Sequence, residues 1–259
     1  MSSLKRTTLT LLANSLLASA SVPTFYNSGT KSGWSGYNAE HLGTVTQVDN
    51  VHVGDSGTSL KMIQTYDPDY SDRYHSEAKL SDAYTVGDEG YYAFSFKLQS
   101  TWDTSSDQTY VIAQTITDFT DDPNNDCGDT WLPSMMLWVE GDQLVIRRKG
   151  NNMCGPWDDG YDQQLYTIGT ISPGPWHRVI LQANWQSSET GSYKVWLDGE
   201  QKLDESNVIT TYIDDGKDRH FQFRVGLYAN SWHDDGKLVG SGNRQIWIDE
   251  VSVGTEFPA

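Results

Sequence analysis

The chain has 259 residues, with 35 acidic and 18 basic side chains and a formal net charge of −17. A chain of this length can bury a substantial core in one domain without metal ions or disulfide crosslinks. The acid excess argues against nucleic acid or an anionic membrane as the partner, because both select basic surfaces. It also argues against a polyanionic substrate, unless the few cations are gathered in one place.

The first twenty residues have the pattern of a secretory signal peptide. Two cations, Lys5 and Arg6, precede an apolar stretch that ends at Leu17, and a small-x-small cleavage pattern follows. The stretch is too short and too polar to span a bilayer, which takes ~20 apolar residues. We therefore expect residues 1–20 to be removed on secretion and residues 21–259 to form a single extracellular domain. Removing two of the 18 cations leaves 16 against 35 acids, a formal charge of −19.

Secretion would also permit a disulfide bond. The two cysteines of the chain, Cys127 and Cys154, both stand in segments rich in Gly, Asp, Asn and Pro. Pairing them would close a span of 27 residues, and loop-closure entropy would make the bond worth about 3–4 kcal/mol. The alternative, a reactive thiol, is less favoured where thiols are oxidised. Two cysteines without further ligands cannot form a structural zinc site.

The rest of the chain consists of short alternating runs separated by turn signals. Val, Ile, Tyr, Phe and Trp dominate these runs, and their period of two is typical of strands. Asp198-Gly199 is a tight hairpin signal. The pattern predicts an all-β fold, an antiparallel β-sandwich of the jelly-roll type. In chain order the runs are SLKMIQTY, YYAFSFKL, TYVIAQTI, SMMLWVEG, QLVIRRKG, HRVILQANW, SYKVWLDG, HFQFRVGLYA and QIWIDEVSV.

Alternation also assigns side chains to the two faces of each expected strand. Strands expected at Ser71–Leu80 and Phe221–Asn230 each carry one polar face, and the first of these faces is mostly cationic. Because cations are scarce in this chain, their clustering favours a binding site over an ordinary solvated surface. Gly226 is expected to leave open space beside Tyr228. The polar faces comprise Arg73, His75, Glu77 and Lys79 on the first strand and Gln222, Arg224, Gly226, Tyr228 and Asn230 on the second.

Other candidate residues allow two interpretations each. Gln114 is the one amide in the apolar strand expected at Tyr110–Thr117, so it is either a satisfied core residue or a group facing a cleft. The densest cationic run either lines a distal part of a substrate site or flanks a hairpin. Several tryptophans either stack on sugar rings or belong to the core. The cationic run is Arg147, Arg148 and Lys149, and the tryptophans are Trp131, Trp138 and Trp232.

Three segments in the same order resemble the secreted jelly-roll polysaccharide lyases, the group that includes alginate lyases. They are RYHSEAK, VIAQT and FRVGLYANSW, in the places of the Arg/Glu-rich substrate strand, the strand presenting a Gln, and the strand ending in Gly-x-Tyr. Alginate lyases usually have a His two residues after that Gln, where this chain has Ile116, and a second Arg where it has Lys79. These departures favour the glucuronan lyases of fungi over alginate lyases.

The resemblance implies β-elimination at a β-1,4-linked polyuronate, giving unsaturated uronic acid ends. Tyr228 is implied as catalytic, either as both base and acid or as the acid with His75 as the base. Gln114, His75 and Arg73 are suited to neutralise the substrate carboxylate, so that charge developing in the transition state is stabilised. A tyrosine pKa is ordinarily near 10, so a neighbouring cation must lower the pKa of a tyrosine base. Arg224 is the candidate, and with Arg73, Lys79 and Asn230 it is also expected to bind substrate.

The resemblance further implies a structural Ca²⁺ away from the cleft, with Asp249 on the last strand as one ligand. The Asp-rich segments of the chain lack the spacing of an EF-hand loop, and no organic cofactor is expected. We expect a monomer that acts on an acidic polysaccharide and binds neither nucleic acid nor membrane. Two other functions remain open: a glycoside hydrolase on the same fold, which needs two carboxylates across the cleft, and a non-catalytic carbohydrate-binding module.

Overall fold

The computed structural model describes residues 22, 24–122, 130–153, 161–213, 216–236 and 238–258. The expected signal peptide lies outside the described residues, and so do both cysteines, Cys127 and Cys154, and their proposed disulfide.

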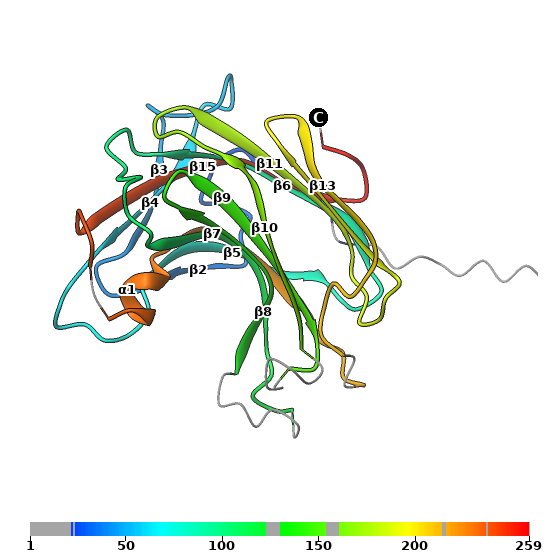
Figure 1. The fold of residues 1–259 in the computed structure, drawn as a ribbon. Helices are drawn as coiled ribbons and strands as arrows, with labels where there is room; N and C mark the ends of the chain where they lie inside the picture. The colour runs from blue at the N-terminus through cyan, green and yellow to red at the C-terminus, as the bar shows by residue number, and fades with distance from the viewer. Residues whose placement is uncertain are drawn as a thin grey trace, which may run out of the picture.

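The described residues form two antiparallel sheets packed face to face, which confirms the predicted β-sandwich (Figure 1). One sheet has the strand order β13-β12-β11-β6-β15-β4-β3, with β1 paired to β15, and the other has the order β10-β9-β8-β7-β14-β5-β2. Among the described residues, no helix is long and apolar enough to cross a membrane. The strands are β1 (Phe25–Asn27), β2 (Gly36–Ala39), β3 (Thr44–Val48), β4 (Ser59–Thr65), β5 (His75–Tyr84), β6 (Glu89–Leu98), β7 (Thr109–Asp118), β8 (Trp131–Glu140), β9 (Gln143–Asn151), β10 (Tyr161–Thr170), β11 (Trp176–Asn184), β12 (Gly191–Leu197), β13 (Glu200–Val208), β14 (Phe221–Tyr228) and β15 (Asn243–Gly254), and the helix is α1 (Asn230–Asp234).

Each of the nine predicted runs lies on a strand, whereas β2, β3 and β10, which end their sheets, were not predicted. The hairpin signal is confirmed, because Asp198 and Gly199 join β12 to β13 with φ angles of 51° and 82°, as a two-residue type I′ turn requires. Two predicted strand limits were wrong. β5 begins at His75 and not at Ser71, and β14 ends at Tyr228, because the chain then turns into α1.

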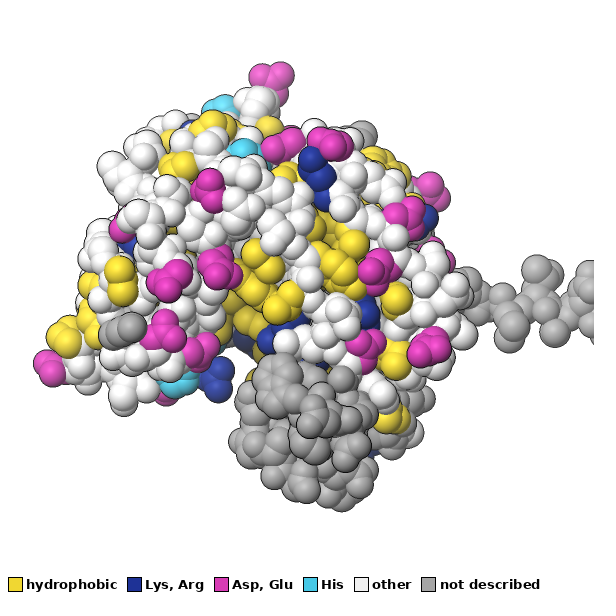
Figure 2. All heavy atoms as spheres, viewed as in Figure 1, with side chains coloured by type: hydrophobic (Ala, Val, Ile, Leu, Met, Phe, Trp, Pro, Cys, Tyr) yellow, Lys and Arg dark blue, Asp and Glu magenta, His cyan; other side chains and the backbone are white. Residues whose placement is uncertain are grey.

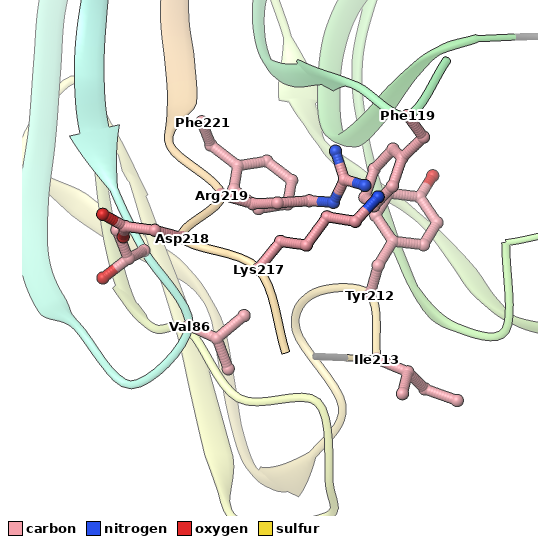
Figure 3. A pocket seen from close by; sticks show the side chains of 9 residues that line it. Val86, Phe119, Tyr212, Ile213, Lys217, Asp218, Arg219 and Phe221 are labelled. Carbon is pink, nitrogen blue, oxygen red and sulfur yellow. The ribbon is translucent and has the colours of Figure 1, made fainter. Parts of the chain in front are cut away.

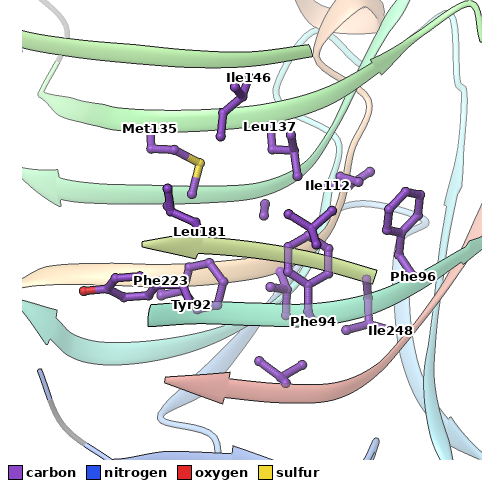
Figure 4. Packing of buried hydrophobic residues seen from close by; sticks show 14 of the residues in the cluster. Tyr92, Phe94, Phe96, Ile112, Met135, Leu137, Ile146, Leu181, Phe223 and Ile248 are labelled. Carbon is purple, nitrogen blue, oxygen red and sulfur yellow. The ribbon is translucent and has the colours of Figure 1, made fainter. Parts of the chain in front are cut away.

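The core lies between the sheets, and alternate side chains of β14 point into it. Phe94 and Phe96 of β6, on one sheet, face Ile112 and Phe223 of the other (Figure 4). The rings of Phe94 and Phe223 lie 6.4 Å apart. Val225 and Leu227 are also fully buried in this core. The intervening side chains of β14 therefore point to the outer face of the seven-stranded sheet, as predicted from the sequence.

The prediction that Gly226 leaves open space beside Tyr228 was wrong. The φ of Gly226 is +148°. A Cβ at this position would lie 2.4 Å from the carbonyl oxygen of Ser76 and 2.8 Å from the Cα of Glu77. The position is filled by the backbone of β5, so glycine is needed for the close approach of two strands.

Gly226→Ala is expected to destabilise the fold by about 1–3 kcal/mol, because the Cβ would meet backbone atoms at a positive φ. Gly254→Ala is the matched control, since a Cβ at Gly254, also on a strand, would meet no atom within 4 Å. Denaturant unfolding of both variants measures the difference. Equal stabilities would show that β5 and β14 can separate at this point.

Candidate active site

A groove of about 730 Å³ lies on the outer face of the seven-stranded sheet. Figure 2 shows a hollow with Lys and Arg side chains at its floor and Asp and Glu side chains on the surface around it. The groove gathers all seven residues predicted to act on the substrate: Arg73, His75, Lys79, Gln114, Arg224, Tyr228 and Asn230. Five Lys and Arg side chains of a chain poor in cations thus lie in one concave site.

His75 and Tyr228 form a stacked pair at one part of this groove. His75 is the first residue of β5 and is paired across the strands with Tyr228, the last residue of β14. Their ring centroids are 4.0 Å apart with an interplanar angle of 25°. Both side chains are largely buried but line the groove. The antiparallel register therefore brings together the two residues that were predicted to act as acid and base.

Glu40 contacts His75 and was missed by the sequence analysis. It directly follows β2, and its Oε2 lies 2.7 Å from His75 Nδ1. The same oxygen accepts a hydrogen bond from the backbone N–H of His75 at 3.1 Å. Glu40 is 35 positions from His75 in an irregular segment, so alternation gave no signal for it. The pairing of β2 with β5 creates the contact.

Glu77 joins Gln114 and Arg224 at the floor of the groove. Gln114 Nε2 donates to Glu77 Oε1 at 2.8 Å, and Arg224 Nη1 lies 3.7 Å from Glu77 Oε2. Gln114 is therefore a cleft residue and also has a buried hydrogen-bond partner. Glu77 is almost fully buried. The sequence placed it on the correct face but did not assign it a role.

Burial raises the pKa of Tyr228 well above its ordinary value, and the negative charges of Asp234 and Glu77 also raise it. Arg73 opposes this shift through its charge and through a hydrogen bond with the tyrosine. The expected cation was Arg224, which instead faces Glu77 and lies over the Trp131 ring, 5.1 Å from its centroid. Arg73 rather than Arg224 is thus the cation that lowers the pKa of Tyr228.

Lys79 and Asn230 border the same groove from different elements. Lys79 is paired in register with Arg224 on β14, so two cations lie side by side on neighbouring strands. Asn230 is the first residue of α1, and its Nδ2 donates to Thr109 Oγ1 at 2.6 Å. Both placements agree with the predicted substrate-binding roles, which stay predictions.

The basic run on β9 is divided between the two faces of the sheet. Arg147 and Lys149 line the groove. Arg148 points the other way and forms a 2.6 Å ion pair with Asp162. Arg147 lies in the middle of β9, and a role for it in a distal part of the substrate site stays a prediction.

The tryptophans also separate into two groups. Trp131 is 39% exposed and lines the groove, where it can stack on a sugar ring. Trp232 is 2% exposed and belongs to the core. Trp138 is partly exposed, and its Nε1 donates to Glu140 at 3.2 Å.

Asp249, the predicted calcium ligand, is fully buried on β15. Its carboxylate accepts hydrogen bonds from the backbone N–H groups of Val53 and Glu250 and from the Ser56 hydroxyl, at 2.6–2.8 Å. The described residues contain no group of three His, Cys, Asp or Glu side chains able to hold a metal. Around Asp249 they supply one carboxylate whose contacts are donors, which suits an anchor for the segment at residues 53–56. Calcium at Asp249 stays a prediction.

A second cavity of about 190 Å³ lies away from these residues and is lined by Phe119, Tyr212, Lys217 and Arg219, among others (Figure 3). Its two cations already have an anionic partner. Lys217 Nζ lies 3.0 Å from Asp121 Oδ2, and Arg219 Nη2 lies 2.8 Å from Asp121 Oδ1. The larger groove is therefore the better candidate for an anionic substrate.

Comparisons with known proteins identify the family of the chain. The chain matches the family described as Polysaccharide lyase over residues 26–252. It is 45% identical to an endo-β-1,4-glucuronan lyase from the fungus Trichoderma reesei, whose crystal structure superposes with a TM-score of 0.83 over 90% of this chain and 95% of that one. No curated protein matched the chain.

More distant structures share only the fold. A marine alginate lyase from Aplysia kurodai is 9% identical, with a TM-score of 0.57 over 90% of this chain and 98% of that one. A carbohydrate esterase from bacteriophage phi24B is 13% identical, with a TM-score of 0.52 over 91% and 100%. Since a lyase and an esterase both have this sandwich, the fold alone does not fix the chemistry. The family match covers most of the sequence and identifies the chemistry as that of a lyase. The chain belongs to the polysaccharide lyase family.

Proposed function

We propose that this polysaccharide lyase cleaves β-1,4-linked glucuronan by β-elimination in the groove of the seven-stranded sheet. The similarity to the Trichoderma reesei enzyme supports the choice of substrate. The single observation that carries the mechanism is the stacked pair of His75 and Tyr228 above a floor with an amide and several cations. In D-glucuronate the C5 hydrogen and O4 lie on the same face of the ring, so an acid and a base that lie side by side can serve both atoms.

His75 acts as the base and Tyr228 as the acid. The C5 proton passes to an imidazole nitrogen, the electron pair forms the C4=C5 double bond, and the C4–O4 bond breaks as O4 takes the Tyr228 proton. The raised pKa of Tyr228 supports this division, because it keeps the hydroxyl protonated at neutral pH. The same shift makes Tyr228 a poor resting base.

The substrate carboxylate has to be neutralised before C5 becomes acidic enough to lose its proton. Gln114 and Arg73 are suitable donors in the same groove, and Arg73 also acts on Tyr228. Hydrogen bonds and positive charge at the carboxylate stabilise the enolate-like transition state more than the ground state. Glu77 holds the Gln114 amide in place and is itself flanked by Arg224.

A longer polyuronate would extend across the strands. In register order, Lys79 on β5, Arg224 on β14, Gln114 on β7, Met136 on β8 and Arg147 on β9 form one row. Neighbouring strands are about 4.8 Å apart, so the row spans roughly 19 Å. Cations stand at both ends, which suits a chain carrying repeated carboxylates. The Trp131 ring beside Arg224 adds an aromatic surface for a sugar.

The proposal has four further parts that play no role in the reaction itself. They are secretion, a monomeric state, a disulfide between Cys127 and Cys154, and a calcium ion at Asp249. Action on an extracellular polysaccharide is what a signal peptide at residues 1–20 would serve. A melting temperature that falls when a chelator is added would support bound calcium, and an unchanged one would contradict it.

Tyr228→Phe is expected to lower kcat on glucuronan by about 10²- to 10⁴-fold, because it removes the proton donor for O4. The rate is followed by the absorbance of the unsaturated product, which a hydrolase would not form. Tyr166→Phe is the control, since Tyr166 donates to Glu205 at 2.6 Å and is not part of the groove lining. Near-native turnover of Tyr228→Phe would refute the proposed mechanism.

The pH dependence of kcat separates the two roles considered for Tyr228. As the acid, Tyr228 must stay protonated, and its raised pKa keeps it so. We therefore expect kcat to be level from about pH 8 to about pH 10, where an ordinary tyrosine would begin to ionise. A tyrosine base would instead give a rate that climbs with pH through this interval.

Arg147→Gln is expected to raise KM for long glucuronan chains by roughly 3- to 10-fold, equivalent to about 1 kcal/mol, with little change in kcat. Arg147 lies three strands beyond Arg224, so it can hold a distant carboxylate but cannot reach the reacting atoms. Lys202→Gln on β13 removes the same charge from an ion pair with Glu200 on the other sheet. If both variants raise KM equally, general charge and not a subsite is responsible.

A further inference from the structure

Glu40 makes a hydrogen-bond contact with the imidazole of the proposed base. Its Oε2 lies 2.7 Å from His75 Nδ1 and 3.1 Å from the backbone nitrogen of His75. The backbone of Glu40 is also fixed, because its N–H donates to the carbonyl of His75 at 2.9 Å and its carbonyl accepts from Gly43 at 2.8 Å. The carboxylate is therefore held in place from both sides before any substrate binds.

We infer that Glu40 is the positioning residue for His75, whose imidazole it holds with the proton on Nδ1 so that Nε2 receives the proton from the substrate. This inference rests on the proposed function, in which His75 is the base. An ionised carboxylate can only accept, so the 2.7 Å contact requires a proton on Nδ1. Neutral imidazole then has its free electron pair on Nε2.

Glu40 is ionised in this arrangement. Burial alone would raise its pKa, but the side-chain and backbone hydrogen bonds from His75, together with the charge of His75 when it is protonated, outweigh burial, and the pKa lies below its ordinary value. When Nε2 takes the C5 proton, the imidazole becomes a cation in direct contact with this carboxylate. Glu40 thus stabilises the charge that appears on His75 during the reaction, besides fixing the ring.

Among the described residues, no other charged group makes a hydrogen bond with the imidazole of His75. Glu77 on the same strand is 3.9 Å from Nε2, but it accepts from Gln114 on β7 and lies near Arg224 on β14. Tyr228 on β14 stacks on the ring and is influenced by Arg73, which precedes β5, and by Asp234 on α1. Asp72 acts on Glu40 itself. Of these groups, Glu40 has the carboxylate in hydrogen-bond contact with the imidazole.

Glu40→Gln tests the inference, with Asp198→Asn as a matched control. Asp198 makes the same pair of contacts on the other sheet: its carboxylate is 2.8 Å from His177 Nδ1 and accepts from the backbone N–H of Arg178 at 2.7 Å. We expect Glu40→Gln to lower kcat by at least about 10-fold without raising KM. Asp198→Asn should change neither.

The outcomes distinguish the positioning role of Glu40 from the proposed role of His75 as the base. A Glu40→Gln enzyme with the parent kcat overturns the positioning role, provided that His75→Gln is inactive. An active His75→Gln enzyme overturns the base assignment itself. Nitrogen NMR of His75 in the unaltered protein gives a readout that does not depend on the stability of any variant. A proton on Nδ1 supports the inference, and a neutral ring protonated on Nε2 contradicts it.

Discussion

The pairing of β5 with β14 is the constraint on which the site depends. The register places His75 opposite Tyr228 and Lys79 opposite Arg224, so one antiparallel ladder aligns both the stacked pair and the first two cations of the row. Gly226 allows β14 to approach β5 closely, because the backbone of β5 occupies the space that any side chain would need. A slip of one residue would move all of these groups into the core face.

The charge of the molecule and the charge of the site have opposite signs. The chain is strongly acidic, yet cations from β5, β14 and β9 meet in one groove. Two carboxylates, Glu40 and Asp234, line that groove, and Glu77 is buried beside Gln114, so the five Lys and Arg side chains of the lining outnumber them. The acids on the surface around the groove suit solubility, and the local cations suit a polyuronate.

The sequence predicted the central strands because alternation is a property of residues buried on one face. β2, β3 and β10 end their sheets, and such edge strands bury too little for a period of two to appear. The same rule put His75, Lys79, Arg224 and Tyr228 on the faces that form the groove, whereas the resemblance to lyases was needed to assign Gln114 to the site. Alternation could not find Glu40, whose contact arises from strand pairing outside a periodic run. It also misplaced the cation beside Tyr228, because the direction of a long side chain is not encoded in alternation.

The stacking of His75 on Tyr228 has a consequence for the end of the catalytic cycle. After the proposed elimination, one ring is an imidazolium and the other a phenolate, with ring centroids that lie 4.0 Å apart in the free enzyme. The proton that must leave the first is the proton that must return to the second. Passing that proton from His75 to Tyr228 regenerates both groups and leaves no net charge behind. The proposed cycle therefore neither takes up nor releases a proton overall.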